Sequence, residues 1–237
     1  MDVLAQRARK AIKRDDEAAL RELLRSGLDV NAMVHKDGEG HCTLLFRAVI
    51  RGSDNLCEVL LAAGADVQIR ETERGGIPLH AVASHGNVAR ARLLLAAARA
   101  NINTRTQSHG LSPLHVACQQ GHTRMATFLI AAGATIAAKS WNALANTPLR
   151  FAIRKGYRAT ALALLRAGAP ITALRSHQIK PVNSALHDYM LEIIDSGGWD
   201  ARVERHRRPL MSILSRLALP HDALSVVLSF WSPPGGH

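Results

Sequence analysis

Aromatic residues are scarce in this sequence. Phenylalanine, tyrosine and tryptophan together make up 4% of the 237 residues, whereas hydrophobic residues make up 47%. The core must therefore be filled by Ala, Leu, Val and Ile, which suits closely packed helices. The sequence has no apolar run of about eighteen residues and therefore predicts no membrane-spanning helix. Its first part mixes acidic and basic side chains, unlike a signal or transit peptide, so we expect a cytoplasmic or nuclear protein without membrane association.

Motifs for catalysis and cofactor binding are absent as well. Cys42, Cys57 and Cys118 form no CxxC pair, which disfavours a disulfide framework and a structural zinc site. We expect them to be reduced thiols in or near the core. The 12 histidines form no H-E-x-x-H pattern, and no G-x-S-x-G, P-loop or dinucleotide-binding glycine pattern occurs. The sequence therefore predicts a protein that is not an enzyme and holds no metal and no cofactor.

Acidic residues are missing from one long stretch. The formal net charge is +11, and residues 74–187 contain fourteen Lys and Arg but no Asp or Glu. A field of one sign raises encounter rates with anionic partners and makes binding sensitive to salt. Three interpretations stay open: an Arg-rich composition on a solvated surface, an acidic protein partner, or nucleic acid. Nucleic acid is disfavoured, because few aromatics are available for base stacking and no DNA-reading motif is visible.

What the sequence does contain is a repeat. Similar segments begin at Thr43, Ile77, Ser112 and Thr147, which are 34, 35 and 35 residues apart. A glycine follows each start after nine residues, an apolar pair comes next, and Gly-Ala closes three of the four units. A period of this length is typical of solenoids, in which each unit buries its apolar face against its neighbours.

The repeated positions predict two helices in every unit. Thr43, Ser112 and Thr147 carry hydroxyl groups that can cap a helix start, and proline follows two of them. The glycine nine residues later can end this first helix in a left-handed conformation. A second amphipathic helix then carries the apolar pair, and the polar segments between units predict turns. Ile77 replaces the hydroxyl cap in one unit, which should weaken that helix start by about 1 kcal/mol at most.

Together these motifs resemble the ankyrin repeat, whose signature is T-P-L-H-x-A followed by glycine, a leucine pair and Gly-Ala. The resemblance implies an all-α solenoid of stacked helix-turn-helix units with a helical C-terminal cap. It also implies that His80 and His115 tie neighbouring turns together by hydrogen bonds. We expect an array over residues 1–173 and a capping region over residues 174–237, with units at about 6–34, 35–69, 70–105, 106–139 and 140–173.

In ankyrin proteins, partners usually lie against the concave side, made by the turn tips and the first helix of each unit. The resemblance therefore implies a monomeric scaffold that binds a protein partner, which the charge suggests is acidic. Trp141 is the best anchor candidate, since an exposed tryptophan offers a large area at low entropy cost; packing onto the neighbouring turn is an equally good interpretation. The partner-binding candidates are Glu73, Arg74, Ser84, His85, Ser108, His109, Leu111, Gln119, Gln120, Trp141, Leu144, Asn146, Arg154 and Lys155.

The last part of the chain leaves a second function open. Residues 219–231 resemble the opening helix of an F-box and, together with residues 209–214, a shortened SOCS box. This resemblance implies a substrate-recognition adaptor of a ubiquitin ligase, which would present an amphipathic helix to a groove on another subunit. The later F-box helices and the SOCS-type Cys and Leu-Pro pairs have no counterpart here, so capping alone is the alternative. The adaptor-helix candidates are Leu219, Leu224, Val227, Leu228 and Phe230.

Overall fold

The computed structural model describes residues 3–35, 40–51, 53–97, 100–141 and 146–170. Within them the chain forms ten α-helices in successive pairs, and one pair falls in each expected unit. None of these helices combines the length and apolarity needed to cross a membrane. The pairs are α1 (Val3–Arg14) with α2 (Glu17–Arg25), α3 (Leu44–Arg51) with α4 (Asp54–Ala62), α5 (Pro78–His85) with α6 (Val88–Ala97), α7 (Pro113–Gln120) with α8 (Thr123–Ala131), and α9 (Pro148–Arg154) with α10 (Arg158–Arg166).

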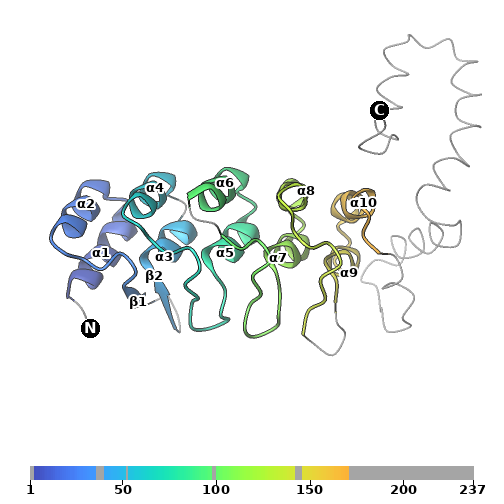
Figure 1. The fold of residues 1–237 in the computed structure, drawn as a ribbon, viewed down its shortest axis with the longest axis horizontal. Coiled ribbons are helices and arrows are strands. Elements are labelled where there is room, and N and C mark those ends of the chain that lie inside the picture. The colour runs from blue at the N-terminus through green and yellow to red at the C-terminus, as the bar shows by residue number, and fades with distance from the viewer. Residues whose placement is uncertain (1–2, 36–39, 52, 98–99, 142–145, 171–237) are drawn as a thin grey trace, which may run out of the picture.

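The helices form two parallel rows. Odd-numbered helices make one row and even-numbered helices the other, and the turns between units project beyond the odd-numbered row (Figure 1). Each pair stacks on the next, so the array is elongated and repeats one contact pattern along its axis. This is the all-α repeat solenoid that the sequence predicts.

Side chains cap the first helices as expected. Thr43, Ser112 and Thr147 each accept a hydrogen bond from the backbone N–H three residues later, at 3.2, 3.4 and 3.3 Å. Ile77 makes no such bond; its own backbone N–H instead donates to Nδ1 of His80 at 3.2 Å. The hydroxyl caps are therefore confirmed, and a histidine satisfies one helix-terminal donor of the unit that lacks a hydroxyl.

Left-handed glycines end the first helices. Gly86, Gly121 and Gly156 have φ angles of 72°, 76° and 77°, a region that side chains with a Cβ adopt at a cost. Gly52, the equivalent residue of the second unit, lies outside the described residues. The predicted glycine ends are confirmed at the three positions that the structure describes.

One connection between units is more regular than a turn. β1 (Met33–His35) pairs antiparallel with β2 (His41–Thr43), and Val34 stands opposite Cys42. The two strands add a small sheet to the expected helical array. Both residues of the Val34–Cys42 pair are buried, so the hairpin contributes to the core as well as connecting two helix pairs.

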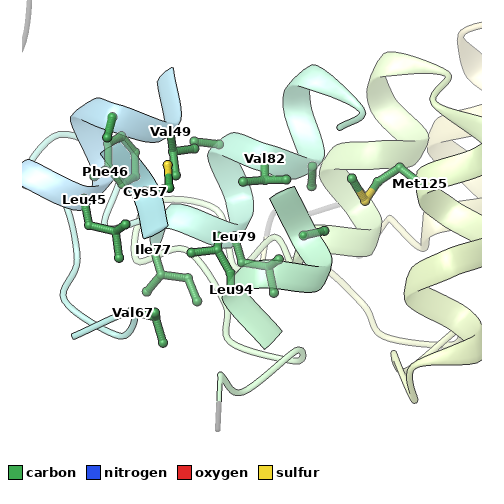
Figure 2. Packing of buried hydrophobic residues seen from close by; sticks show 14 of the residues in the cluster. Leu45, Phe46, Val49, Cys57, Val67, Ile77, Leu79, Val82, Leu94 and Met125 are labelled. Atoms are coloured by element: carbon green, nitrogen blue, oxygen red, sulfur yellow. The ribbon is translucent and has the colours of Figure 1, made fainter. Parts of the chain in front are cut away.

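The core is one cluster that continues through all the described units. Figure 2 shows Ile77, Leu79 and Leu94 packed together, while Val49 of the preceding unit lies near Cys57 and Phe46. Cys42, Cys57 and Cys118 are buried free thiols, as predicted. Burial raises the pKa of the Cys57 and Cys118 thiols to about 12, so both stay protonated and behave as small apolar side chains.

His80 and His115 link neighbouring units. The Nδ1 atom of each ring accepts the backbone N–H three residues earlier, which places the proton on Nε2. Nε2 of His80 then donates to the Leu111 carbonyl at 2.9 Å, and Nε2 of His115 donates to the Asn146 carbonyl at 3.1 Å. Burial lowers the pKa of both rings to about 4, so they are neutral at pH 7. Their predicted bridging role is confirmed.

Candidate partner-binding groove

A groove of about 550 Å³ runs along the first helices and the turns of four successive units. Its floor comes from α3, α5, α7 and α9, and its wall comes from the turns before α5 and α7. Apolar, neutral polar and cationic side chains all contribute to the lining. The lining residues are Phe46, Ile50, Glu71, Arg74, Gly76, His80, Ala81, Ser84, His85, Thr106, Ser108, His109, Leu111, Val116, Gln119, Gln120, Phe151 and Arg154.

The turn before α5 is held by a buried carboxylate. Glu71 accepts hydrogen bonds from the backbone N–H groups of Glu73 at 2.9 Å, Arg74 at 2.7 Å and Gly76 at 3.2 Å. These three N–H donors stabilise the carboxylate, and the Glu71 side chain in return holds the backbone of its own turn in place. The Arg74 side chain stays exposed at the surface of the wall, 3.6 Å from the Glu73 carboxylate.

Two guanidinium groups connect successive turns. Nη1 of Arg70 donates to the carbonyl oxygens of Gly75 at 2.5 Å and Arg105 at 2.6 Å. Nη1 of Arg105 donates in the same way to the Lys139 carbonyl in the next turn at 2.6 Å. Both arginines therefore contribute to the stiffness of the wall, and not every cation of the basic region is available to a partner.

Trp141 stacks on the preceding turn and is exposed as well. Gly110 has a φ of 63°, and a Cβ atom built on it would lie 2.3 Å from Cγ of Trp141. The Trp141 backbone N–H donates to the His109 carbonyl at 2.9 Å. The side chain nevertheless remains 60% exposed. Both interpretations of this tryptophan therefore describe part of its geometry, since one face packs on Gly110 and the rest meets solvent.

Cations gather at the α9 end of the groove. The Arg154 guanidinium lies over the Phe151 ring, 5.3 Å from its centroid. Arg150 is buried next to it, and burial, followed by the charge of Arg154, lowers the pKa of Arg150. No Asp or Glu occurs between residues 74 and 187, so no carboxylate of α5 to α10 balances these charges. This end of the groove is therefore lined by the cation Arg154, with Arg150 buried next to it.

Comparison with protein families settles what kind of array this is. A family model described as "Ankyrin repeats (3 copies)" matches residues 45–140 and 79–174, which together are more than half of the chain. The chain belongs to the ankyrin-repeat family. A similar curated protein is "Potassium channel AKT3" of Oryza sativa subsp. japonica, with 36% identity over 89 residues, 38% of this chain and 9% of that protein. The ankyrin chain therefore spans far less than two thirds of that relative's length.

Most of the partner-binding candidates lie in or beside the ankyrin groove. Glu73, Lys155 and Trp141 are exposed next to it, the first two as chain neighbours of lining residues and Trp141 through its turn contact. Leu144 lies outside the described residues. That any of them contacts a partner stays a prediction. Nine of the fourteen candidates line the groove: Arg74, Ser84, His85, Ser108, His109, Leu111, Gln119, Gln120 and Arg154.

Asn146 requires a correction. Its residue is only 1% exposed, and its backbone carbonyl accepts hydrogen bonds from His115 and from the Ser140 N–H at 2.9 Å. A side chain that is buried in this way cannot contact a partner. Asn146 therefore helps to hold the last described turn on the ankyrin array and is removed from the candidate site.

The apolar floor of the groove was missed from the sequence. Phe46, Ile50, Val116 and Phe151 all line it, and none was among the partner-binding candidates. Ile50 is 37% exposed and stands 34 residues before Ser84, which was a candidate. The repeat register would have identified Ile50, since equivalent positions of an ankyrin array face the same way.

Two other sets of predictions find no test in the described residues. The adaptor-helix candidates Leu219, Leu224, Val227, Leu228 and Phe230 lie outside them, as does the whole capping region 174–237. Among the residues that are described, no group of three or more His, Cys, Asp or Glu side chains gathers as metal ligands would.

Proposed function

We propose that this ankyrin array is a non-catalytic scaffold that holds a protein partner in the groove. Ankyrin repeats are protein-interaction modules, and the groove is the observation that carries the proposal for this chain. Four units contribute to one depression, and several of its lining side chains are exposed or half-buried, whereas the apolar core lies beneath it. We further propose that the scaffold acts as a monomer in the cytoplasm or the nucleus.

The charges of the groove support an acidic partner. Arg74 and Arg154 are its cationic lining residues, and Glu71 is its one carboxylate. Three backbone N–H groups bond to Glu71 and surround this buried carboxylate with the positive ends of N–H dipoles, while two arginine charges outnumber its single charge in the lining. A positive groove attracts an acidic segment during encounter and disfavours basic competitors.

A stiff groove also lowers the entropic cost of binding. The floor is made of packed helices, and guanidinium and histidine side chains tie each turn to the next. Little of the described groove has to become ordered when the partner arrives, so more of the contact energy appears as affinity.

Filling the groove tests the proposal. Ser84→Trp in α5 and Gln119→Trp in α7 place a large side chain in the groove, and Thr127→Trp on exposed α8 is the matched control. Partners are purified on the full chain and quantified by mass spectrometry, with circular dichroism as a folding check. We expect partner recovery to fall about tenfold or more for both groove variants and to stay unchanged for the control. Equal recovery with all three variants would contradict the proposal.

The adaptor role is a separate proposal that is supported by residues 219–231 alone. Purification with and without residues 209–237 tests it. Ligase subunits that appear only with the full chain would support an adaptor that selects its substrate through the ankyrin groove. Identical partners after truncation would exclude that role and leave the scaffold.

A further inference from the structure

The side chains along the groove floor change in one direction. The last turns of α3, α5, α7 and α9 offer equivalent positions that are 34, 35 and 35 residues apart, and all four line the groove. The sequence at this position runs from aliphatic through neutral polar to cationic. The four residues are Ile50, Ser84, Gln119 and Arg154.

A second row shows the same order. It lies four residues earlier in each helix, which is about one helical turn and therefore on the same face. Aromatic, histidine and arginine side chains follow one another along it, and the residues are Phe46, His80, His115 and Arg150. Phe46 and His80 of this row line the groove, whereas His115 and Arg150 are buried and do not. The row that ends at Arg154 therefore gives the groove its apolar end at α3 and its cationic end at α9.

The apolar end of the groove exposes hydrophobic side-chain surface to solvent. Ile50 is one of four large hydrophobic side chains that the described residues leave exposed, together with Val3, Met33 and Trp141. Among these four, Ile50 is the one that lines the groove, and the Phe46 ring lies beside it in the lining. Covering this aliphatic surface removes apolar area from water and favours an apolar ligand side chain.

The cationic end presents a charge that a ligand can reach, since Arg154 lines the groove and is half-buried. The Arg154 guanidinium lies over the Phe151 ring, and burial, followed by the charge of Arg154, lowers the pKa of the neighbouring Arg150. A ligand carboxylate would pair with Arg154 and offset the repulsion between the two guanidinium groups. Arg74, in the wall, already has the Glu73 carboxylate 3.6 Å away, so the α9 end is the stronger anion site.

We propose that the groove binds an extended acidic segment in one orientation, with an apolar side chain over Ile50 and Phe46 and a carboxylate at Arg154. The inference rests on the proposed function and adds the polarity of the ligand to it. Packed helices lie about 8–10 Å apart, so three steps from α3 to α9 cover about 24–30 Å. An extended chain spans this length with about 7–9 residues, which sets the separation between the apolar and the acidic side chain.

Selection from a library of random 12-residue peptides displayed on phage tests the proposal with the full chain as bait. We expect enrichment of sequences in which Leu, Ile or Phe and Asp or Glu are separated by about 7–9 positions. Arg154→Glu should replace the acidic preference with a basic one, and Ile50→Ser should remove only the apolar preference. The matched control is Arg124→Glu, the same charge change on an exposed residue of α8 outside the groove. For one selected peptide, Arg154→Glu should weaken binding about tenfold and Arg124→Glu less than about twofold.

The outcomes separate this inference from the proposed function. If Arg154→Glu and Arg124→Glu select the same peptides as the unchanged chain, or if no peptide is enriched, the inferred polarity is wrong. If peptides are enriched without this polarity and Gln119→Trp abolishes their binding, the groove still binds protein segments and the proposed function stands. If peptides bind equally well to Gln119→Trp, the groove is not the binding site and both proposals fail.

Discussion

The first helices of the units have a buried face, on which residue types repeat from unit to unit, and a groove face, on which they differ. On the buried face, one position carries leucine in all four units from α3 to α9: Leu45, Leu79, Leu114 and Leu149. On the groove face, one position carries a different residue in every unit: Ile50, Ser84, Gln119 and Arg154. The buried position meets the same neighbours in each unit, so one residue type fits everywhere. The groove position lines a depression instead of packing in the core, so the packing of the units does not require one residue type there.

The buried face should be the most sensitive to change. Leu114→Ala creates a cavity in an inner unit that packs against helices on both sides, and we expect a loss of about 2–5 kcal/mol in the free energy of unfolding. Gln119→Ala, in the last turn of the same helix, should change it by less than about 0.5 kcal/mol. Urea denaturation of both variants measures the difference. Similar losses for the two would show that the faces are not energetically distinct.

Gly110, at a turn tip in the wall of the groove, tests whether close packing makes the wall as sensitive to substitution as the buried face. Gly110→Ala places a Cβ at a φ of 63° and 2.3 Å from Cγ of Trp141, so we expect a loss of about 2–3 kcal/mol. Gly133→Ala is the control: it has a φ of 93° but nothing within 4 Å, and about 1 kcal/mol of backbone strain is expected.

Trp141→Ala tests whether the Trp141 ring causes the loss of stability expected for Gly110→Ala. In the double variant with Gly110→Ala the steric conflict is gone, so the two effects should be less than additive in a double-mutant cycle. Strict additivity in chemical denaturation would contradict the stacked geometry of the two turns.

The bridging histidines should make the array sensitive to acid. The folded pKa of His80 and His115 is about 4, below the 6.5 of an unperturbed histidine, so the unfolded state binds protons first. Their contribution is complete above pH 6.5 and declines as the pH falls from about 6.5 towards 4. Between pH 7.5 and 5.5 each ring should cost about 1.4 kcal/mol of stability. The double variant His80→Gln, His115→Gln should lose this slope, whatever its stability at pH 7.5, and an unchanged slope would exclude the two rings as its source.

The sequence predicted the structural features that recur within each unit and between neighbouring units. Hydroxyl caps at Ser112 and Thr147 and glycine ends at Gly86 and Gly121 follow from residue chemistry at repeated positions, and the resemblance to ankyrin repeats implied the bridging role of His115. These features depend on contacts within a few residues, or on a contact that recurs in each unit. Each of these features therefore occurs several times in the repeat sequence, which makes it recognisable.

Features that arise once were not predictable in the same way. The β1–β2 pairing and the three N–H groups around Glu71 depend on how one particular turn folds. The contact from Arg70 to the Arg105 carbonyl joins residues 35 positions apart. Asn146 was a partner-binding candidate, yet its carbonyl accepts hydrogen bonds within the fold and its side chain is buried. The groove itself depends on the relative placement of four units, which the sequence pattern does not contain.

Among the residues of the groove face, Arg154 should contribute least to the free energy of unfolding. Arg154→Gln loses the contact with the Phe151 ring and a favourable charge in the last turn of α9, but it also removes repulsion from Arg150. These opposing effects should leave the free energy of unfolding within about 0.5 kcal/mol of the original value. Leu149→Ala, in the same helix on the buried face, is the control and should cost at least about 2 kcal/mol. A loss of that size for Arg154→Gln would mean that the arginine is retained for folding, and the separation between a packing face and a binding face would not hold at the α9 end.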